Sequence, residues 1–322
     1  MPTKKEKILV TGAGGFIGHH MVGFLKDKGY WVRGVDIKEP EYSSTEIADE
    51  FLLLDLRVPE NAIKATKGID KVYNYAANMG GVGFIETVKA DIMHDSVLIN
   101  ANVVNACKEN GVKRVFYSSS ACIYPVSKQT NAAVTALKES DAYPANPDTE
   151  YGWEKIFSER LFSSFAADHG LEVRIARYHN IFGPEGTYDG GREKAPAAIC
   201  RKVAQTKNGE EIEVWGDGEQ TRSFCYIDDC LEGTYKLMES DCNTPLNIGS
   251  DRLISINELV KMVSKIAGKK LKIKHLLDKP QGVRGRNSDN TLLKKTLNWE
   301  PKITLEEGFT KTYEWIKKDL GK

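Results

Sequence analysis

Short runs of β-branched and other apolar residues alternate with longer segments of mixed character through the first half of the chain. Strands are short, whereas helices run for about ten residues or more, so length and period separate the two. We predict strands at 8–10, 31–36, 50–54, 71–75, 113–118 and 172–177. Helices are predicted up to residue 28, at 91–110 and at 150–170. This alternation indicates an α/β fold with a parallel, doubly wound sheet.

The regular alternation fades after about residue 177. Glycine-rich and charged stretches appear at 183–192 and 215–222, and late helices are predicted at 255–267 and 305–318. We interpret this half as a smaller α/β domain placed over the carboxyl ends of the strands.

The length of 322 residues suggests roughly two domains. We predict the sheet domain at 1–176, with a return segment near 224–248, and the smaller domain at 177–322. Hydrophobic residues make up 41% and charged residues 28%, which is ordinary globular usage and excludes a disordered or fibrous chain.

The charge balance and the spacing of the cysteines exclude several kinds of partner and site. Lysine plus arginine and aspartate plus glutamate both number 45, so no net charge favours nucleic acid or a membrane surface. No apolar stretch approaches the roughly 18 residues of a membrane span, and no secretory leader is apparent. The six cysteines form no C-x-x-C pair and no zinc-type spacing with histidine, so neither a disulfide scaffold nor a metal site is expected. We expect a soluble, cytoplasmic protein without nucleic-acid or membrane partners.

Three glycines follow the first predicted strand with the spacing G-x-x-G-x-x-G, at Gly12, Gly15 and Gly18. Such a loop lets backbone N–H groups approach a pyrophosphate at the helix N-terminus, although a tight turn without ligand has the same glycines. Asp36 ends the second strand, where an acid accepts hydrogen bonds from ribose hydroxyls and repels a 2′-phosphate, which favours NAD over NADP. Asp55 ends the third strand and either contacts the adenine edge or is solvated; both interpretations stay open.

Tyr151 and Lys155 stand four positions apart at the start of a predicted helix, and therefore on one face. A nearby ammonium, together with a positive nicotinamide, would favour the tyrosinate, which can take up or return a proton. Ser120 ends a serine-rich strand, where its hydroxyl could orient a reacting oxygen. The alternative to a catalytic pair is that Tyr151 and Lys155 share this spacing by chance on an exposed helix face.

At this point the chain resembles the extended short-chain dehydrogenase/reductase family over its whole length, with a Rossmann-type sheet domain. Among its branches it looks most like the GDP-mannose 3,5-epimerases. The matching segments are 76–84, 119–125 (Ser-Ser-Ala-Cys-Ile-Tyr-Pro), 179–184, 190–198 (Gly-Gly-Arg-Glu-Lys-Ala-Pro-Ala-Ala), 215–223 and 282–290.

The resemblance implies a redox-neutral reaction on GDP-mannose with tightly bound NAD, giving GDP-L-galactose, and GDP-L-gulose by epimerisation at C5 alone. Oxidation at C4 through Tyr151 and Lys155 would make the C3 and C5 hydrogens α to a carbonyl. Cys122 and Lys194 would act as base and acid from opposite sides of the ring before C4 is reduced again. The base role needs the thiolate, so its surroundings must favour the anion. The sheet domain would bind NAD and the smaller domain the nucleotide sugar.

The resemblance and the motifs together give the remaining site residues. Gly80 and Gly81 would leave room for the sugar ring to turn, and Asn180 and Glu193 would bond its hydroxyls. The expected cofactor contacts are Gly12, Gly15, Phe16, Ile17, Gly18, Asp36, Asp55, Leu56, Ala76, Tyr151 and Lys155. The expected substrate contacts are Gly80, Gly81, Ser120, Ala121, Cys122, Asn180, Glu193, Lys194, Ala195, Lys202, Gln220, Arg222 and Arg286, with Arg222 and Arg286 on the diphosphate. His19 and His20 are expected to pack or to face solvent, and His179 is expected to be a structural neighbour of the site rather than an acid. The family also implies a homodimer through the helices at 91–110 and 150–170.

Four other functions are weighed against this one. A GDP-4-keto-6-deoxymannose epimerase-reductase, of the GDP-fucose synthase type, shares the 119–125 string but uses NADPH and a histidine acid, which Asp36 and Lys194 disfavour. A UDP-sugar 4-epimerase commonly has threonine in place of Cys122, and a 4,6-dehydratase has Thr-Asp-Glu there. A non-catalytic NAD-sensing scaffold usually loses the tyrosine or lysine, and both are present.

Overall fold

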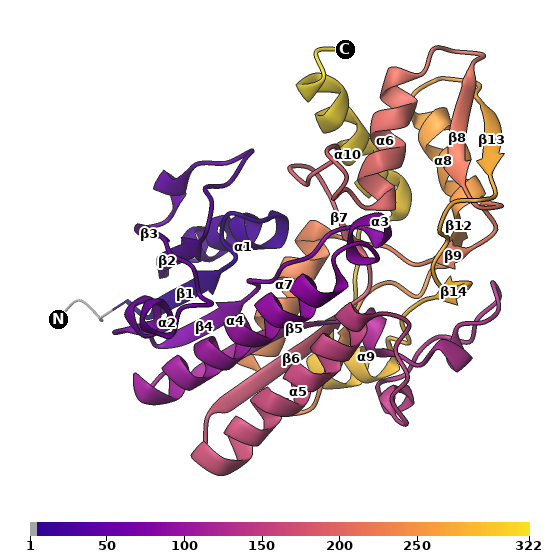
Figure 1. Ribbon diagram of the computed structural model, residues 1–322. Coiled ribbons are helices and arrows are strands. Elements are labelled where there is room, and N and C mark those ends of the chain that lie inside the picture. Colours follow the sequence, from indigo (N-terminus) through magenta and orange to yellow (C-terminus); the bar gives the residue numbers. More distant parts are fainter. Residues whose placement is uncertain (1–4) are drawn as a thin grey trace.

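A seven-stranded, all-parallel sheet forms the centre of the computed structural model, which describes residues 5–322 (Figure 1). Its strands are β1 (Lys7–Thr11), β2 (Trp31–Asp36), β3 (Glu50–Leu53), β4 (Lys71–Asn74), β5 (Arg114–Ser120), β6 (Glu172–Tyr178) and β11 (Leu246–Ile248). The strand order is β11-β6-β5-β4-β1-β2-β3. All six predicted strands are confirmed, with ends displaced by at most two residues, and so is the doubly wound fold.

Helices cover both faces of this sheet. The sheet-covering helices are α1 (Phe16–Asp27), α2 (Pro59–Thr66), α4 (Lys89–Glu109), α5 (Glu150–His169) and α7 (Ile227–Glu239), and two shorter ones are α3 (Val82–Ile85) and α9 (Thr291–Leu297). Helix α4 packs between α2 and α5 on one face, and α1 packs against α7 on the other. Each face buries its own apolar cluster against the sheet.

Local signals in the sequence set the ends of α5. Thr149 is the N-cap residue, and its side chain accepts a hydrogen bond from the Gly152 N–H at 3.2 Å, which satisfies one of the free donors of the first turn. Gly170 ends the helix in the left-handed conformation, with φ +69°. The predicted boundaries at 150–170 are confirmed because both caps are local.

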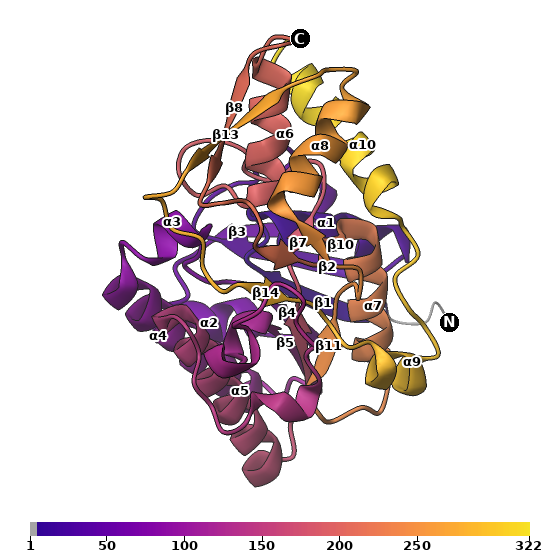
Figure 2. The same ribbon diagram turned by 90° about the vertical axis from the view of Figure 1, so that its right-hand side faces the viewer.

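A second group of elements lies over the carboxyl ends of the sheet strands (Figure 2). Its helices are α6 (Ala195–Gln205), α8 (Ile256–Ile266) and α10 (Leu305–Asp319). Its short strands are β7 (Ile181–Phe182), β8 (Glu211–Trp215), β9 (Thr221–Arg222), β10 (Cys225–Tyr226), β12 (Ile254–Ser255), β13 (Lys272–Leu276) and β14 (Gly285–Arg286). They form the pairs β8–β13 and β7–β10 and the three-stranded sheet β12-β9-β14.

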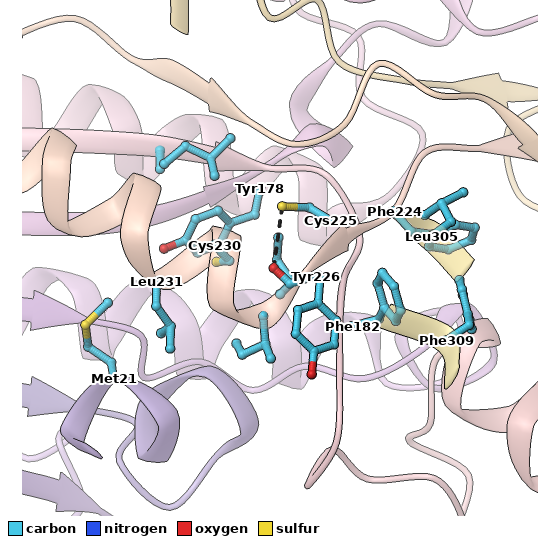
Figure 3. Packing of buried hydrophobic residues seen from close by; sticks show 14 of the residues in the cluster. Met21, Tyr178, Phe182, Phe224, Cys225, Tyr226, Cys230, Leu231, Leu305 and Phe309 are labelled. Carbon is cyan, nitrogen blue, oxygen red and sulfur yellow. Dashed lines mark hydrogen bonds between the residues drawn. The ribbon is translucent and has the colours of Figure 1, made fainter. Parts of the chain in front are cut away.

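One apolar cluster joins the two groups of elements. Figure 3 shows it running from Met21 on α1, past Tyr178 at the end of β6, to Phe309 on α10. Phe182 stacks on Phe309 with ring centroids 4.3 Å apart, and Phe224 meets the same ring edge-on. Because interiors are close-packed, this continuity fixes the second group over the sheet. None of the described helices is long and apolar enough to cross a membrane.

Four single-turn 3₁₀ segments complete the described elements. They are η1 (Thr45–Ile47), η2 (Ala121–Ile123), η3 (Val126–Lys128) and η4 (Glu139–Ala142). Of these, η2 bears on function most directly, because it follows β5 immediately and carries Cys122.

Candidate active site

A cavity of about 1380 Å³ opens between the sheet and the second group of elements. It lies at the carboxyl ends of β1 and β4, where the strand order reverses and where ligands bind in open α/β sheets. Every cofactor-binding, substrate-binding and catalytic residue proposed from the sequence lines this one cavity. Positions more than 270 residues apart in the chain, such as Gly12 and Arg286, are thereby brought to one place.

The glycine loop fits a dinucleotide. Gly12 has φ +70°, and a Cβ there would lie 2.8 Å from the backbone of Ala76. A Cβ on Gly18 would lie 1.9 Å from the Gly12 carbonyl oxygen, so only glycine lets α1 start this close to β1. Gly15 is the N-cap residue, and the first turn of α1 carries no acidic side chain. The free N–H groups and the helix dipole thus face the cavity without an internal anion.

Asp36 and Asp55 occupy the ends of their strands in different ways. The Asp36 carboxylate accepts the Gly14 N–H at 2.9 Å, and burial raises its pKa despite three backbone hydrogen bonds. Asp55 is held by Arg57, with Nη2 to Oδ2 at 2.7 Å, and hydrogen bonding to Arg57 lowers the pKa of Asp55. The Asp55 carboxylate is therefore less available to an adenine edge than its position in the sequence suggests.

Tyr151 and Lys155 lie side by side on the buried face of α5. The Lys155 Nζ is 5.6 Å from the Tyr151 ring centroid and donates a hydrogen bond to the Ser118 carbonyl at 3.0 Å. Lys155 is only 2% exposed, and burial lowers its pKa. Ser120 lines the cavity beside this pair, and its hydroxyl accepts the N–H of Cys122 at 3.1 Å.

The protein groups around Tyr151 favour its neutral, protonated form. Burial raises the pKa of Tyr151, and the charges of Cys122 and Glu154 raise it further. A hydrogen bond with Ser120 and the charge of Arg286 act in the opposite direction but are smaller. Desolvation is thus the largest effect of the protein itself on this hydroxyl, and the expectation that an ammonium and a positive nicotinamide together favour the tyrosinate stays a prediction.

Cys122 contacts the Arg286 guanidinium, which the sequence analysis placed on the diphosphate instead. Arg286 Nη1 donates to the Cys122 Sγ at 3.0 Å. The same side chain, buried in β14, bonds the Gln129 amide oxygen through Nε and lies 3.5 Å from the Asp148 carboxylate through Nη2. A fixed positive charge therefore lies against the Cys122 sulfur, and it is the thiolate form of a cysteine that removes protons.

Helix α5 reaches Cys122 through a close backbone contact. A Cβ on Gly152 would lie 2.3 Å from the Cys122 carbonyl oxygen, so glycine beside Tyr151 is what allows α5 to pack against η2. The contact sets the spacing between the tyrosine and the thiol.

Lys194 reaches the cavity from the second group of elements. It is the N-cap residue of α6, and it is open to the cavity rather than packed. The surrounding protein lowers the pKa of Lys194 by desolvation, and Lys155 adds to this while Cys122 opposes it. A lysine of lowered pKa gives up a proton more easily, as a general acid requires.

The family follows from comparison with known proteins. The model for the NAD dependent epimerase/dehydratase family matches residues 8–249, about three quarters of the chain. The chain belongs to this family.

Relatives of this NAD dependent epimerase/dehydratase cover the chain from end to end. GDP-mannose 3,5-epimerase of Arabidopsis thaliana is 51% identical over 322 residues, which are 100% of this chain and 85% of that protein. Among solved structures, UDP-glucose 4-epimerase of Thermotoga maritima has a TM-score of 0.87 at 28% identity, covering 98% and 99% of the two chains. UDP-glucuronic acid 4-epimerase of Bacillus cereus, solved with UDP-glucuronic acid and NAD, has a TM-score of 0.83 at 27% identity and covers 97% and 99%.

In this family member, Gly80 and Gly81 serve chain packing. A Cβ on Gly81 would lie 2.4 Å from the Glu193 carbonyl oxygen, and the Gly81 N–H bonds the Arg192 carbonyl at 3.0 Å. A Cβ on Gly80 would lie 2.9 Å from the Phe84 ring. Both glycines line the cavity, so the expectation that they leave room for a turning sugar stays a prediction, and Gly81 in addition seats the loop that carries Lys194.

The polar groups proposed for the substrate are partly engaged within the epimerase. The Asn180 amide nitrogen donates to the Ser223 carbonyl at 2.9 Å, and Glu193 Oε2 accepts the Gly191 N–H at 2.6 Å. Lys202 donates to the Glu213 carbonyl at 3.0 Å. Each side chain keeps free donor or acceptor capacity toward the cavity.

Gln220 and Arg222 stand at the same wall of the cavity. Gln220 donates to the Trp215 carbonyl at 3.2 Å, and its amide oxygen has no partner among the described residues. Burial, together with the charge of Arg286, lowers the pKa of Arg222 to about 10. Two guanidinium groups on one wall make it strongly electropositive.

Sequence reasoning missed Gln129 and Asp148, which hold Arg286 in place. Neither lies in a recognisable motif, and Gln129 is fully buried. Only the folded chain brings them to β14, so no local signal could have identified them.

Proposed function

We propose that this protein is a GDP-mannose 3,5-epimerase, which converts GDP-D-mannose to GDP-L-galactose, and to GDP-L-gulose by inversion at C5 alone. The observation that carries the proposal is the meeting of Tyr151, Cys122 and Lys194 in one cavity. Full-length identity of 51% to the Arabidopsis enzyme supports the choice of GDP-mannose.

Bound NAD would supply the hydride acceptor for oxidation at C4 of the sugar and the hydride donor for the final reduction. The glycine loop and Asp36 would hold the dinucleotide, which fits the cradle described above. Tyr151 Oη would remove the proton from the C4 hydroxyl, and Ser120 would orient that oxygen. Since burial opposes a standing Tyr151 anion, Tyr151 would pass its own hydroxyl proton to a neighbouring polar group as it accepts the C4 hydroxyl proton, and would take it back when C4 is reduced.

A ketone at C4 makes the C3 and C5 hydrogens acidic, and inversion then needs groups on two sides of the ring. Cys122 would remove a proton as the thiolate, stabilised by Arg286. Lys194 would return a proton from the side of α6, helped by its lowered pKa. After inversion, Tyr151 would give its proton back to the C4 oxygen.

The division of labour between the two halves also belongs to this proposal. Residues 1–176 with the return segment near 224–248 would bind NAD, and 177–322 would bind the nucleotide sugar. Arg222 and Lys202 would meet the diphosphate, because the Arg286 guanidinium is already held by Cys122, Gln129 and Asp148.

We further infer a cytoplasmic homodimer. All six cysteines are free, as is usual in a reducing compartment. Trp153 is 43% and Phe157 49% exposed on α5, four positions apart and thus on one face. Exposed aromatic pairs on a long helix favour a second helix as partner.

Product analysis tests the function. Purified protein is incubated with GDP-mannose, and separately with UDP-glucose, without added NAD, and the nucleotide sugars are separated. We expect the galactose- and gulose-configured products from GDP-mannose alone, and none with Tyr151→Phe. Conversion of UDP-glucose with no change in GDP-mannose would overturn the proposal in favour of a 4-epimerase.

A further inference from the structure

Two adjacent histidines on α1 converge with a glutamate from the loop that precedes α6. One ligand atom from each of His19, His20 and Glu185 lies within 4.8 Å of the others. The His19 Nε2 is 3.0 Å from Glu185 Oε2, and the His20 Nε2 is 3.9 Å from the same oxygen. None of these side chains lines the cavity or takes part in the proposed reaction.

The two polar contacts of the His19 ring are best satisfied if a cation lies in this cluster. Its Nδ1 lies 2.9 Å from the Gly15 carbonyl oxygen, which can only accept, so the N–H is placed there. In the neutral ring the Nε2 lone pair then points at a carboxylate oxygen 3.0 Å away. Two acceptors at that distance repel unless a positive charge lies between them or on the ring.

We propose that His19, His20 and Glu185 bind one divalent transition-metal ion of the zinc type. Two imidazoles and a carboxylate form a common zinc donor set, with the fourth position open to water. In a tetrahedral zinc site, bonds of about 2.0–2.1 Å place ligand atoms roughly 3.3 Å apart, which lies between the 3.0 and 3.9 Å that separate Glu185 Oε2 from the two imidazole nitrogens.

The surroundings suit the three ligands. A metal-bound histidine usually donates its other N–H to a backbone carbonyl, as His19 does to Gly15. To bind the ion, His20 Nε2 gives up its 3.1 Å hydrogen bond to the Pro184 carbonyl. Glu185 has φ +61°, an uncommon backbone state for a residue with a side chain.

Such an ion would fasten the glycine loop to the loop that carries Lys194. Gly15 caps α1 on one side, and Glu185 precedes Lys194 by nine residues on the other. The site is independent of the epimerase proposal, because it uses none of the residues assigned there.

Equilibrium binding of Zn²⁺ tests the site. Protein stripped by chelator and dialysed is titrated with Zn²⁺ in competition with a chromophoric indicator. Cys122 and Cys242 are replaced by serine throughout, so that no accessible thiol holds the ion; the other four cysteines are buried. The variants are His19→Asn, His20→Asn and Glu185→Gln, and His94→Asn, with a 69% exposed side chain, is the matched control.

We expect one Zn²⁺ per chain, with affinity at least about tenfold weaker in each ligand variant and unchanged in His94→Asn. Circular dichroism and retained nicotinamide confirm that each variant is folded. In addition, Co²⁺ should give the visible absorption of a four-coordinate site only where all three ligands remain. Equal Zn²⁺ affinity in the parent and in Glu185→Gln would overturn the proposal.

Discussion

The Cys122 thiol contacts a guanidinium that lies 164 positions away along the chain. The motif around Arg286 suggested a phosphate contact, because arginine forks bind diphosphates well. The fold turns the side chain toward sulfur instead, with Gln129 and Asp148 fixing its other nitrogens. Because Cys122, Gln129 and Asp148 together hold the Arg286 guanidinium, the charge beside the Cys122 sulfur is fixed, and this makes the thiol a candidate base.

Replacing Arg286 by glutamine removes the charge that stabilises the thiolate. Hydrogen bonds to charged groups contribute about 1.5–3 kcal/mol, so we expect alkylation of Cys122 at neutral pH to slow by roughly 10- to 100-fold. Epimerisation should fall in parallel. The rate of modification by iodoacetamide, followed by mass spectrometry, measures the effect. Arg252→Gln, which breaks a surface pair with Glu306, is the control and should change neither rate. Unchanged alkylation in Arg286→Gln would contradict the role given to the guanidinium.

The buried imidazole of His179 should make the folded protein less stable in acid. Burial, together with the charges of Arg286 and Arg177, lowers the pKa of His179 to about 3. The unfolded chain protonates this imidazole near pH 6.5, so the unfolded state gains the proton first as the pH falls. Between pH 6.5 and 4 the free energy of unfolding should therefore drop by up to about 1.4 kcal/mol per pH unit, and the contribution is constant above pH 6.5.

Urea unfolding at a series of pH values measures that slope. His179→Gln, which keeps a donor for the Asn247 oxygen, should flatten it, whereas the exposed His94→Gln should not. An identical slope in His179→Gln would mean that other groups cause the acid sensitivity.

Among the elements, those with local signals were predictable and those defined by distant contacts were not. Strands β1 to β6 and helix α4 lie in segments whose own pattern predicts them, and α5, α8 and α10 also carry N-capping side chains in their own sequence. The pair β8 and β13 joins segments about 60 residues apart, and β13 has little buried surface to mark it as a strand. Helix α6 begins at a proline within a glycine-rich stretch that reads as a loop.

The same distinction applies to the site. Gly12, Gly15, Gly18 and Tyr151 could be assigned because the dinucleotide and catalytic motifs are contiguous. The cluster around Glu185 could not, because its histidines lie about 165 positions away and form no metal-type spacing. Residues that come together only in the folded chain are not marked by any local pattern in the sequence.

The contact between α3 and the Lys194 loop can be tested with two neighbouring glycines. Alanine at Gly81 would place its Cβ 2.4 Å from the Glu193 carbonyl oxygen, so the loop must shift. We expect turnover to fall by about 10- to 100-fold, since displacement of a catalytic group by about 1 Å has that effect. Alanine at Gly83 meets only the Trp215 ring at 3.5 Å, an ordinary contact, and should keep near-full activity. Steady-state rates on GDP-mannose compare the two; equal activity would show that the 81–193 contact does not place Lys194.

At the scale of the whole molecule, the shared apolar cluster makes the cavity a fixed feature between the sheet and the elements above it. Met21, Tyr178 and Phe309 belong to one packed core although they come from distant parts of the chain (Figure 3). Rigid walls suit a reaction in which one sugar must present C3, C4 and C5 in turn to groups on different elements.

The proposed homodimer gives a prediction about assembly. Glutamate at both Trp153 and Phe157 places charge on the exposed apolar face of α5 and should shift the protein from dimer to monomer. Sedimentation velocity measures the change. Leu277→Glu, at a side chain that is 71% exposed in the second group of elements, is the control and should stay dimeric. A wild-type protein that sediments as a monomer at micromolar concentration would refute the dimer.

Proton NMR of GDP-mannose with the purified protein in D₂O, without added NAD, follows the epimerisation at each carbon of the sugar. We expect loss of the C3 and C5 proton signals with C4 hydrogen retained, new galactose- and gulose-type resonances, and no C3 or C5 exchange with Cys122→Ala. Exchange at C3 and C5 that persists in Cys122→Ala at the wild-type rate would contradict the assigned base. No exchange in the wild-type protein, even after NAD is added, would contradict the function itself.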